Sequence, residues 1–159
     1  MPRIARIVLS IIVVFSLSLI VGCSMFGPSD EDTAQAGALM DQMADYNQWE
    51  TVPGYDDWEQ GTSVHGRVVR YFVNDIAIGN MRDLPAGSII VKEGYNRDRE
   101  LQAVTVMQRI AGYDPEHGDW FWARYSPSGE LTHAGSVAMC IDCHQDAEGD
   151  DYSFANAGF

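Results

Sequence analysis

Two cysteines and a histidine near the C-terminal end, Cys140, Cys143 and His144, decide which cofactor and which folds this chain can use. The pattern C-x-x-C-H is the attachment site of a c-type haem. On a helix, residues three and four apart share a face, so the two thiols can each meet one haem vinyl group. The motif also predicts that one ring nitrogen of His144 binds the iron. The other ring nitrogen is then expected to donate to a backbone carbonyl.

Zinc, a thioredoxin-like redox pair and a structural disulfide are the alternative uses of such a cysteine pair. Zinc is usually held by four ligands from two such motifs, and the sequence has no second one. A redox pair is usually placed near a βαβ pattern, which is missing here. The third cysteine of the chain, Cys23, has a separate explanation. Covalent haem c, one per chain, is therefore the favoured interpretation.

The N-terminal stretch 1–22 has the pattern of an export signal. Arg3 and Arg6 form a basic start, and the apolar run 7–20 is shorter than the about 20 residues of a membrane span. It ends before Cys23 in a way that resembles a bacterial lipoprotein signal, in which the cysteine is acylated. An uncleaved anchor helix is the alternative. We expect an exported protein, lipid-anchored on the periplasmic side of a membrane.

Charge limits the choice of partners. Without the signal, 8 basic residues face 23 acidic ones, a net charge of about −15. This balance disfavours nucleic acid and anionic membrane surfaces as partners. It suits an exported domain with a basic redox partner, and equally a plain solvated acidic surface. We expect a tether over 23–32 and one domain over 33–159.

The periodicity of the remaining chain predicts an α+β fold, with a mostly antiparallel sheet, flanking helices and a C-terminal helix that carries the haem motif. A helix is expected over 33–49, capped by Asp32 or Thr33, with Met40 and Met43 in the core. The other expected elements are strands over 67–73, 88–93, 101–110 and 120–125, a short helical excursion over 74–84 and the haem helix over 133–146.

Lys92 is the only lysine in the chain. In its predicted strand it shares a face with Ile90 by period-two alternation. On an apolar face its amine would lose solvation, which favours the neutral, nucleophilic form. An ordinary edge-strand lysine is the alternative.

The C-terminal half resembles the cytochrome P-460 family and its relative cytochrome c-prime-beta. The matching pieces, in the family's order, are Tyr71-Phe72-Val73-Asn74, Gly87-Ser88-Ile89-Ile90-Val91-Lys92-Glu93, Gly118-Asp119-Trp120-Phe121-Trp122-Ala123, the C-x-x-C-H motif and Asp151-Tyr152-Ser153-Phe154.

The resemblance implies a homodimer with a five-coordinate haem and His144 as proximal ligand. It implies that Lys92 is the position of a covalent cross-link to the haem macrocycle. It places Arg70 and Phe72 near the distal pocket. Cytochrome P-460 oxidises hydroxylamine and handles nitric oxide, whereas the c-prime-beta relatives lack the cross-link and bind gases.

Three functions follow as hypotheses. The first is a redox enzyme for hydroxylamine or nitric oxide at an open iron site, passing electrons to another cytochrome. The second is a nitric oxide binder without turnover. The third is a plain electron carrier whose sixth iron position is filled by Met107, Met81 or His65.

Overall fold

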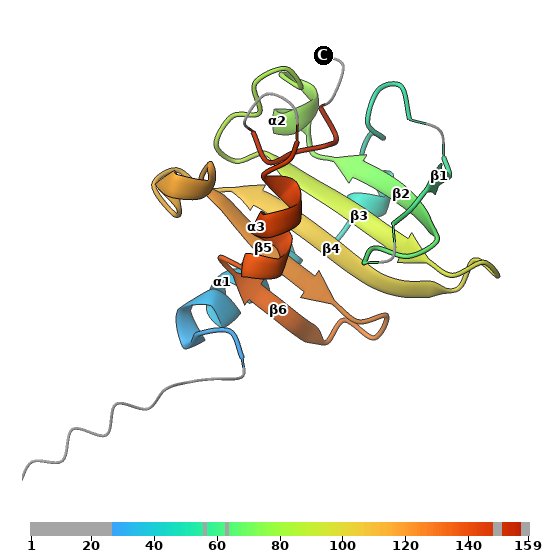
Figure 1. Cartoon of the computed structure of the whole chain (residues 1–159), viewed down its shortest axis with the longest axis horizontal. Helices are drawn as coiled ribbons and strands as arrows, with labels where there is room; N and C mark the ends of the chain where they lie inside the picture. The colour runs from blue at the N-terminus through green and yellow to red at the C-terminus, as the bar shows by residue number, and fades with distance from the viewer. Residues whose placement is uncertain (1–26, 56, 63, 148–150, 157–159) are drawn as a thin grey trace, which may run out of the picture.

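The computed structural model describes residues 27–55, 57–62, 64–147 and 151–156; Cys23 and the predicted signal lie outside them. Its elements are α1 (Asp30–Gln42), η1 (Tyr46–Gln48), β1 (Glu59–Gln60), β2 (Val68–Val73), α2 (Asp75–Ile78), β3 (Ile89–Tyr95), β4 (Leu101–Arg109), η2 (Pro115–His117), β5 (Trp120–Tyr125), β6 (Leu131–Gly135) and α3 (Ala138–His144) (Figure 1). None of the helices in this described part is long and apolar enough to cross a membrane.

A six-stranded sheet forms the centre of the fold. Its order is β1-β2-β3-β4-β5-β6, and every neighbouring pair is antiparallel. The predicted α+β class is therefore confirmed. The four predicted strands are present, because β-branched and aromatic runs alternate between two buried faces.

The strand β6 corrects the predicted start of the haem helix. His133 was expected at the beginning of that helix, but it lies in β6 opposite Arg124 of β5. Gly135 then takes a positive φ of 102°, and α3 begins only at Ala138. An edge strand of five residues carries too little sequence pattern to distinguish its end from the first turn of a helix.

The first helix also starts and ends earlier than predicted. Ser29 is the N-cap, and its hydroxyl oxygen accepts from the N–H of Asp32 at 3.0 Å. Acidic residues in the first turn favour this end of the helix. The helix therefore begins inside the segment 23–32 that we predicted to be a tether, and it ends at Gln42 instead of Trp49.

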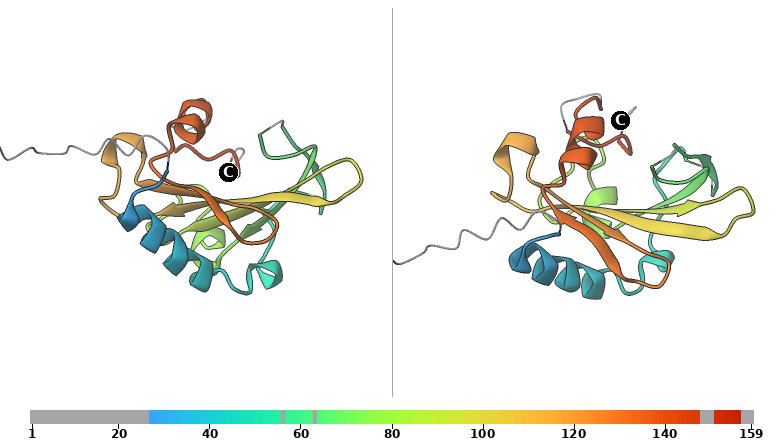
Figure 2. Two further views of the ribbon diagram at one scale, coloured as in Figure 1. Left: turned by 90° about the horizontal axis from the view of Figure 1, so that it is seen from below. Right: turned by 60° about the horizontal axis from the view of Figure 1, so that its bottom comes forward.

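The sheet separates two apolar clusters, which lie on its two faces. One face is covered by α1, which lies below the sheet in the left view of Figure 2, while α3 lies above it. The α1 side includes Phe72, Val91, Val106, Phe121 and the predicted core residue Met43. The other side, called the cavity face below, includes Val73, Ile90, Met107, Trp120 and Trp122.

Candidate haem site

A cavity of about 460 Å³ lies between the cavity face, α3 and the C-terminal segment. Its size falls within the roughly 300–1,000 Å³ of cofactor and ligand sites. Most of its surface is apolar, and the polar side chains are few. The residues that line it are Thr62, Val64, His65, Tyr71, Ile90, Lys92, Thr105, Val106, Met107, Trp122, Ala123, Arg124, His133, Met139, Cys140, Cys143, His144, Ser153, Phe154 and Ala155.

The ring of His144 is held in one orientation. Its Nδ1 donates to the carbonyl oxygen of Tyr152 at 2.7 Å, the backbone hydrogen bond that the motif predicts. Trp122 and Phe154 pack against the ring edge-on, at centroid distances of 4.7 and 5.2 Å. Burial lowers the pKa of His144 to about 4, so the ring is neutral at pH 7. Its Nε2 keeps a lone pair for a metal.

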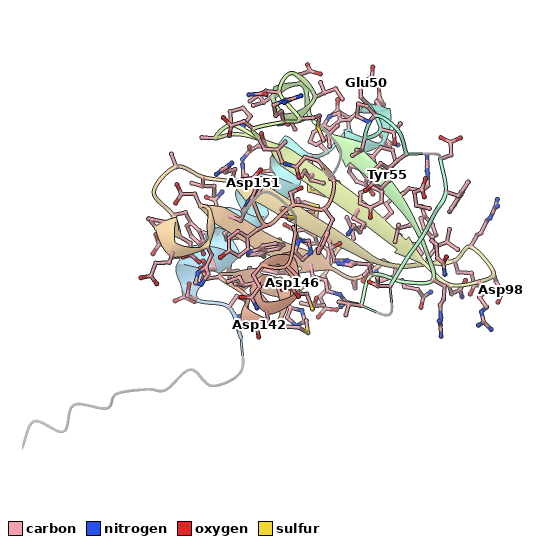
Figure 3. The ribbon with its side chains drawn as sticks, turned by 45° about the horizontal axis from the view of Figure 1, so that its top comes forward. Glu50, Tyr55, Asp98, Asp142, Asp146 and Asp151 are labelled. Atoms are coloured by element: carbon pink, nitrogen blue, oxygen red, sulfur yellow. The ribbon has the colours of Figure 1, made fainter. Side chains whose placement is uncertain are left out.

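Both cysteines of the motif line the same cavity from α3. Their thiols are free, with Cys140 half-buried and Cys143 exposed. Burial raises the pKa of Cys140 to about 11, so it stays a thiol. Asp142, between them, and Asp146, just after the helix, are exposed at the outer side of this segment (Figure 3). The helix therefore turns its sulfur atoms and imidazole to the cavity and its acids to solvent.

Lys92 lies in the cavity with the haem motif. It shares the cavity face with Ile90, as the alternation predicted, and it is in register with Tyr71 of β2 and Thr105 of β4. Its Nζ lies 4.9 Å from the centroid of the Tyr71 ring. Burial lowers the pKa of Lys92 to about 8, so a substantial fraction of the amine is neutral near pH 8.

Arg70 and Phe72 do not reach this cavity, which corrects their predicted place in a distal pocket. Phe72 belongs to the cluster under α1, and Arg70 lies 3.6 Å from the carboxylate of Glu93 on the same side. A shift of one residue along a strand moves every side chain to the other face. Tyr71, between them, takes the cavity position.

The cavity also brings together side chains that the sequence analysis did not place in it. Thr105, Arg124 and His133 lie on the strands, and Tyr71 lies opposite Lys92 in the β2–β3 register. His65 enters from the turn before β2, and no periodicity predicts the direction of a turn side chain. Of the three proposed sixth ligands, His65 and Met107 line the cavity, whereas Met81 is buried in the core beside it.

The cavity has the chemistry that a haem requires. Among the described lining residues no side chain is acidic, although the whole chain carries 23 acidic residues. Arg124 supplies a positive charge that suits an anionic macrocycle. The indole N–H of Trp122 is buried without a hydrogen-bond partner, and such a donor normally has one. A cysteine pair, a fixed imidazole, an apolar lining and an unpaired donor fit this cofactor.

An antiparallel sheet that holds such a cavity under a C-x-x-C-H helix defines a haem-binding cytochrome. The family model for cytochrome P460 matches residues 43–155. The chain belongs to the cytochrome P460 family, and haem is its cofactor. No curated protein matches the sequence.

Proposed function

We propose that the protein is an exported, membrane-anchored mono-haem c cytochrome that acts on small nitrogen species, hydroxylamine or nitric oxide. The observation that carries this proposal is the presence of Lys92 in one cavity with Cys140, Cys143 and His144. By the family resemblance, a cross-link from this lysine to the macrocycle is what separates hydroxylamine oxidation from gas binding.

Each residue of the motif has a role in this proposal. Cys140 and Cys143 would form thioethers with the haem vinyl groups, and Nε2 of His144 would bind the iron. The haem, when bound, supplies an iron that binds a small ligand and exchanges single electrons. The ring contacts of Trp122 and Phe154 fix the imidazole, and the apolar lining limits the access of water.

Lys92 is the residue we propose as the cross-link to the macrocycle. Desolvation favours its neutral amine, and arginine at this position would stay protonated. A bond between Nζ and a ring carbon replaces one N–H and one C–H. Two electrons and two protons then leave, and an oxidant of the peroxide class has to accept the electrons.

The test of this function is turnover by the haem-loaded protein. We expect hydroxylamine to be oxidised in the presence of an electron acceptor, and a tryptic haem peptide to join Lys92 to the 140–144 segment. Lys92→Arg should abolish the cross-link and the turnover while both thioethers remain. An ordinary c-type spectrum that Lys92→Arg does not change would contradict the cross-link.

A nitric oxide binder without turnover is the second candidate, and one observation favours it. Hydroxylamine loses protons when it is oxidised, and no carboxylate lines the described part of the cavity to accept them. Tight nitric oxide binding without hydroxylamine consumption would select this candidate. If the protein neither binds nitric oxide nor consumes hydroxylamine, the remaining candidate is a plain electron carrier.

Anchoring and partners belong to the same proposal. Acylation of Cys23 would hold the protein on the periplasmic side of a membrane, a basic cytochrome would accept its electrons, and the family resemblance favours a homodimer. Cys23→Ser should release the protein to the soluble periplasmic fraction or leave the signal uncleaved. Detergent-requiring membrane association of a cleaved Cys23→Ser variant would refute the lipid anchor.

A further inference from the structure

A second imidazole, that of His65, is built into the cavity by the turn between β1 and β2. The N–H groups of His65 and Gly66 donate to the carbonyl oxygen of Thr62 at 3.1 and 3.0 Å. The turn lies directly on β3, because a Cβ on Gly94 would overlap the carbonyl of His65. Gly66 has a φ of 114°, and a Cβ there would meet the backbone of Tyr95 at 2.7 Å. Two glycines thus permit this close approach and fix the histidine's backbone.

The hydrogen bonds of His65 leave one ring nitrogen with a free lone pair. Its Nδ1 lies 3.1 Å from Oγ1 of Thr105. That hydroxyl donates its single hydrogen to the carbonyl oxygen of Lys92 at 3.3 Å, so toward His65 it accepts. Nδ1 therefore carries the proton, and Nε2 does not. His144 has the same arrangement, with Nδ1 bound to Tyr152.

The separation of the two rings distinguishes an iron ligand from a residue that only contacts an iron-bound ligand. The ring centroids of His65 and His144 are 6.1 Å apart, and their planes make an angle of 80°. Metal–imidazole bonds are about 2.0–2.1 Å long, so two imidazoles on opposite sides of one ion have centroids about 6 Å apart. A histidine that hydrogen-bonds to an iron-bound ligand stands further away, by a hydrogen bond of about 2.8 Å.

The other candidate ligands in the cavity are engaged elsewhere. Met107 is 8% exposed and packs in the apolar cluster of the cavity face with Ile90 and Trp122. The amine of Lys92 lies over the ring of Tyr71. His133 belongs to the edge strand β6, where its Nδ1 lies 3.1 Å from the hydroxyl of Thr132.

We propose that Nε2 of His65 is a sixth iron ligand opposite His144, which an incoming nitrogen ligand displaces. The open site expected from the sequence is then one that opens when His65 leaves. Only one coordination bond is exchanged for another, so the displacement needs no oxidant or reductant. The ligand assignment depends on haem in this cavity, and only the displacement step rests on the proposed function.

Absorption and electron paramagnetic resonance spectra of the haem-loaded full chain test the assignment at neutral pH. We expect the wild type to be six-coordinate and low-spin, and His65→Ala to be high-spin until added imidazole restores the low-spin signal. His133→Ala, which removes the one histidine of the cavity lining that we do not propose as an iron ligand, should keep the wild-type spectrum. The proposal would be overturned if the wild type were high-spin or if His65→Ala were low-spin without imidazole. A change to high-spin haem caused by His133→Ala would overturn it as well.

Nitric oxide binding to the ferrous protein separates this inference from the proposed function. In the wild type the observed rate should reach a plateau set by the departure of His65, and in His65→Ala it should rise linearly and be at least about tenfold faster at high ligand concentration. A linear, fast wild-type rate would contradict displacement. If His65→Ala changes spin state but neither protein binds nitric oxide or consumes hydroxylamine, the ligand assignment stands and the proposed function fails.

Discussion

His144 and the carbonyl oxygen of Tyr152 are joined by a 2.7 Å hydrogen bond, and Tyr152 presents that oxygen from a left-handed backbone conformation with φ 54°. A non-glycine residue in this region carries strain. The ring of Tyr152 also packs edge-on against His117. The C-terminal segment thus fixes the tautomer of the residue we assign as the axial ligand.

Replacing Tyr152 should change the reduction potential of the haem. Proline forces a negative φ, so Tyr152→Pro should remove the carbonyl from Nδ1 and make His144 a weaker donor to ferric iron. If the preference of His144 for ferric over ferrous iron falls tenfold, the reduction potential rises by about 59 mV. Potentiometric titration measures the change. Tyr152→Asn, which tolerates the left-handed conformation, should stay close to the wild type; an equal shift in both variants would argue against the backbone as the cause.

Substitution of the two cysteines tests whether the cavity holds covalently attached haem and not a metal ion alone. Cys140→Ala and Cys143→Ala should each leave one thioether, visible as a shifted pyridine haemochrome band, and the double variant should lose its haem in acid–acetone. The reason is that each cysteine forms one thioether bond with one vinyl group of the haem. Retention of haem by the double variant in this extraction would mean that the thioether assignment is wrong.

Lys92 predicts a pH dependence of stability in the haem-free Cys140→Ala/Cys143→Ala chain. Burial lowers the pKa of Lys92 from 10.5 to about 8, so between these values the unfolded chain binds more protons than the folded one. The free energy of unfolding should therefore rise with pH, by about 2 kcal/mol from about pH 7.5 to about pH 9.5. Urea titrations measure it. In Lys92→Met the rise should disappear; a rise that persists would assign it to another group.

Gly135 predicts a stability loss at the junction of β6 and α3. Its φ is 102°, and a Cβ there would meet the carboxylate of Asp32 at 2.7 Å. Gly135→Ala should therefore cost both backbone strain and displacement of that carboxylate, about 2–3 kcal/mol in total. Gly129→Ala is the matched control, because its φ is 82° and nothing lies within 4 Å. It should cost only about 1 kcal/mol. If denaturant titrations give the same loss of unfolding free energy for Gly135→Ala and Gly129→Ala, the carboxylate of Asp32 moves aside without a measurable cost.

Much of the fold was predictable because it depends on local patterns. Alternating apolar residues identified β2, β3, β4 and β5, and the position of Lys92 on the face of Ile90 followed from the same period of two. The C-x-x-C-H motif predicted a helical segment with its cysteines and histidine on one side. These signals are contained within a few consecutive residues.

The remaining parts depend on contacts between distant residues. The two-residue strand β1 and the edge strand β6 exist through pairing with β2 and β5 and have little pattern of their own. Arg70 and Phe72 were assigned from a family resemblance, in which an error of one position reverses the face. His65 reaches the cavity only because Gly94, nearly thirty residues later, leaves room for its backbone.

Tyr71 pairs with Lys92 and Phe72 pairs with Val91, so an odd-numbered residue of β2 lies opposite an even-numbered residue of β3, and the reverse. Odd-numbered positions of β2 face the haem cavity, whereas in β3 the even-numbered positions do. A conservative substitution scan along the β2–β3 hairpin would thus change the colour of the protein at alternate positions only, at 71, 90 and 92. Positions 72, 89 and 91, on the α1 side, would change the melting temperature and leave the colour as it is, whereas Ile90, which is 3% exposed, would change both.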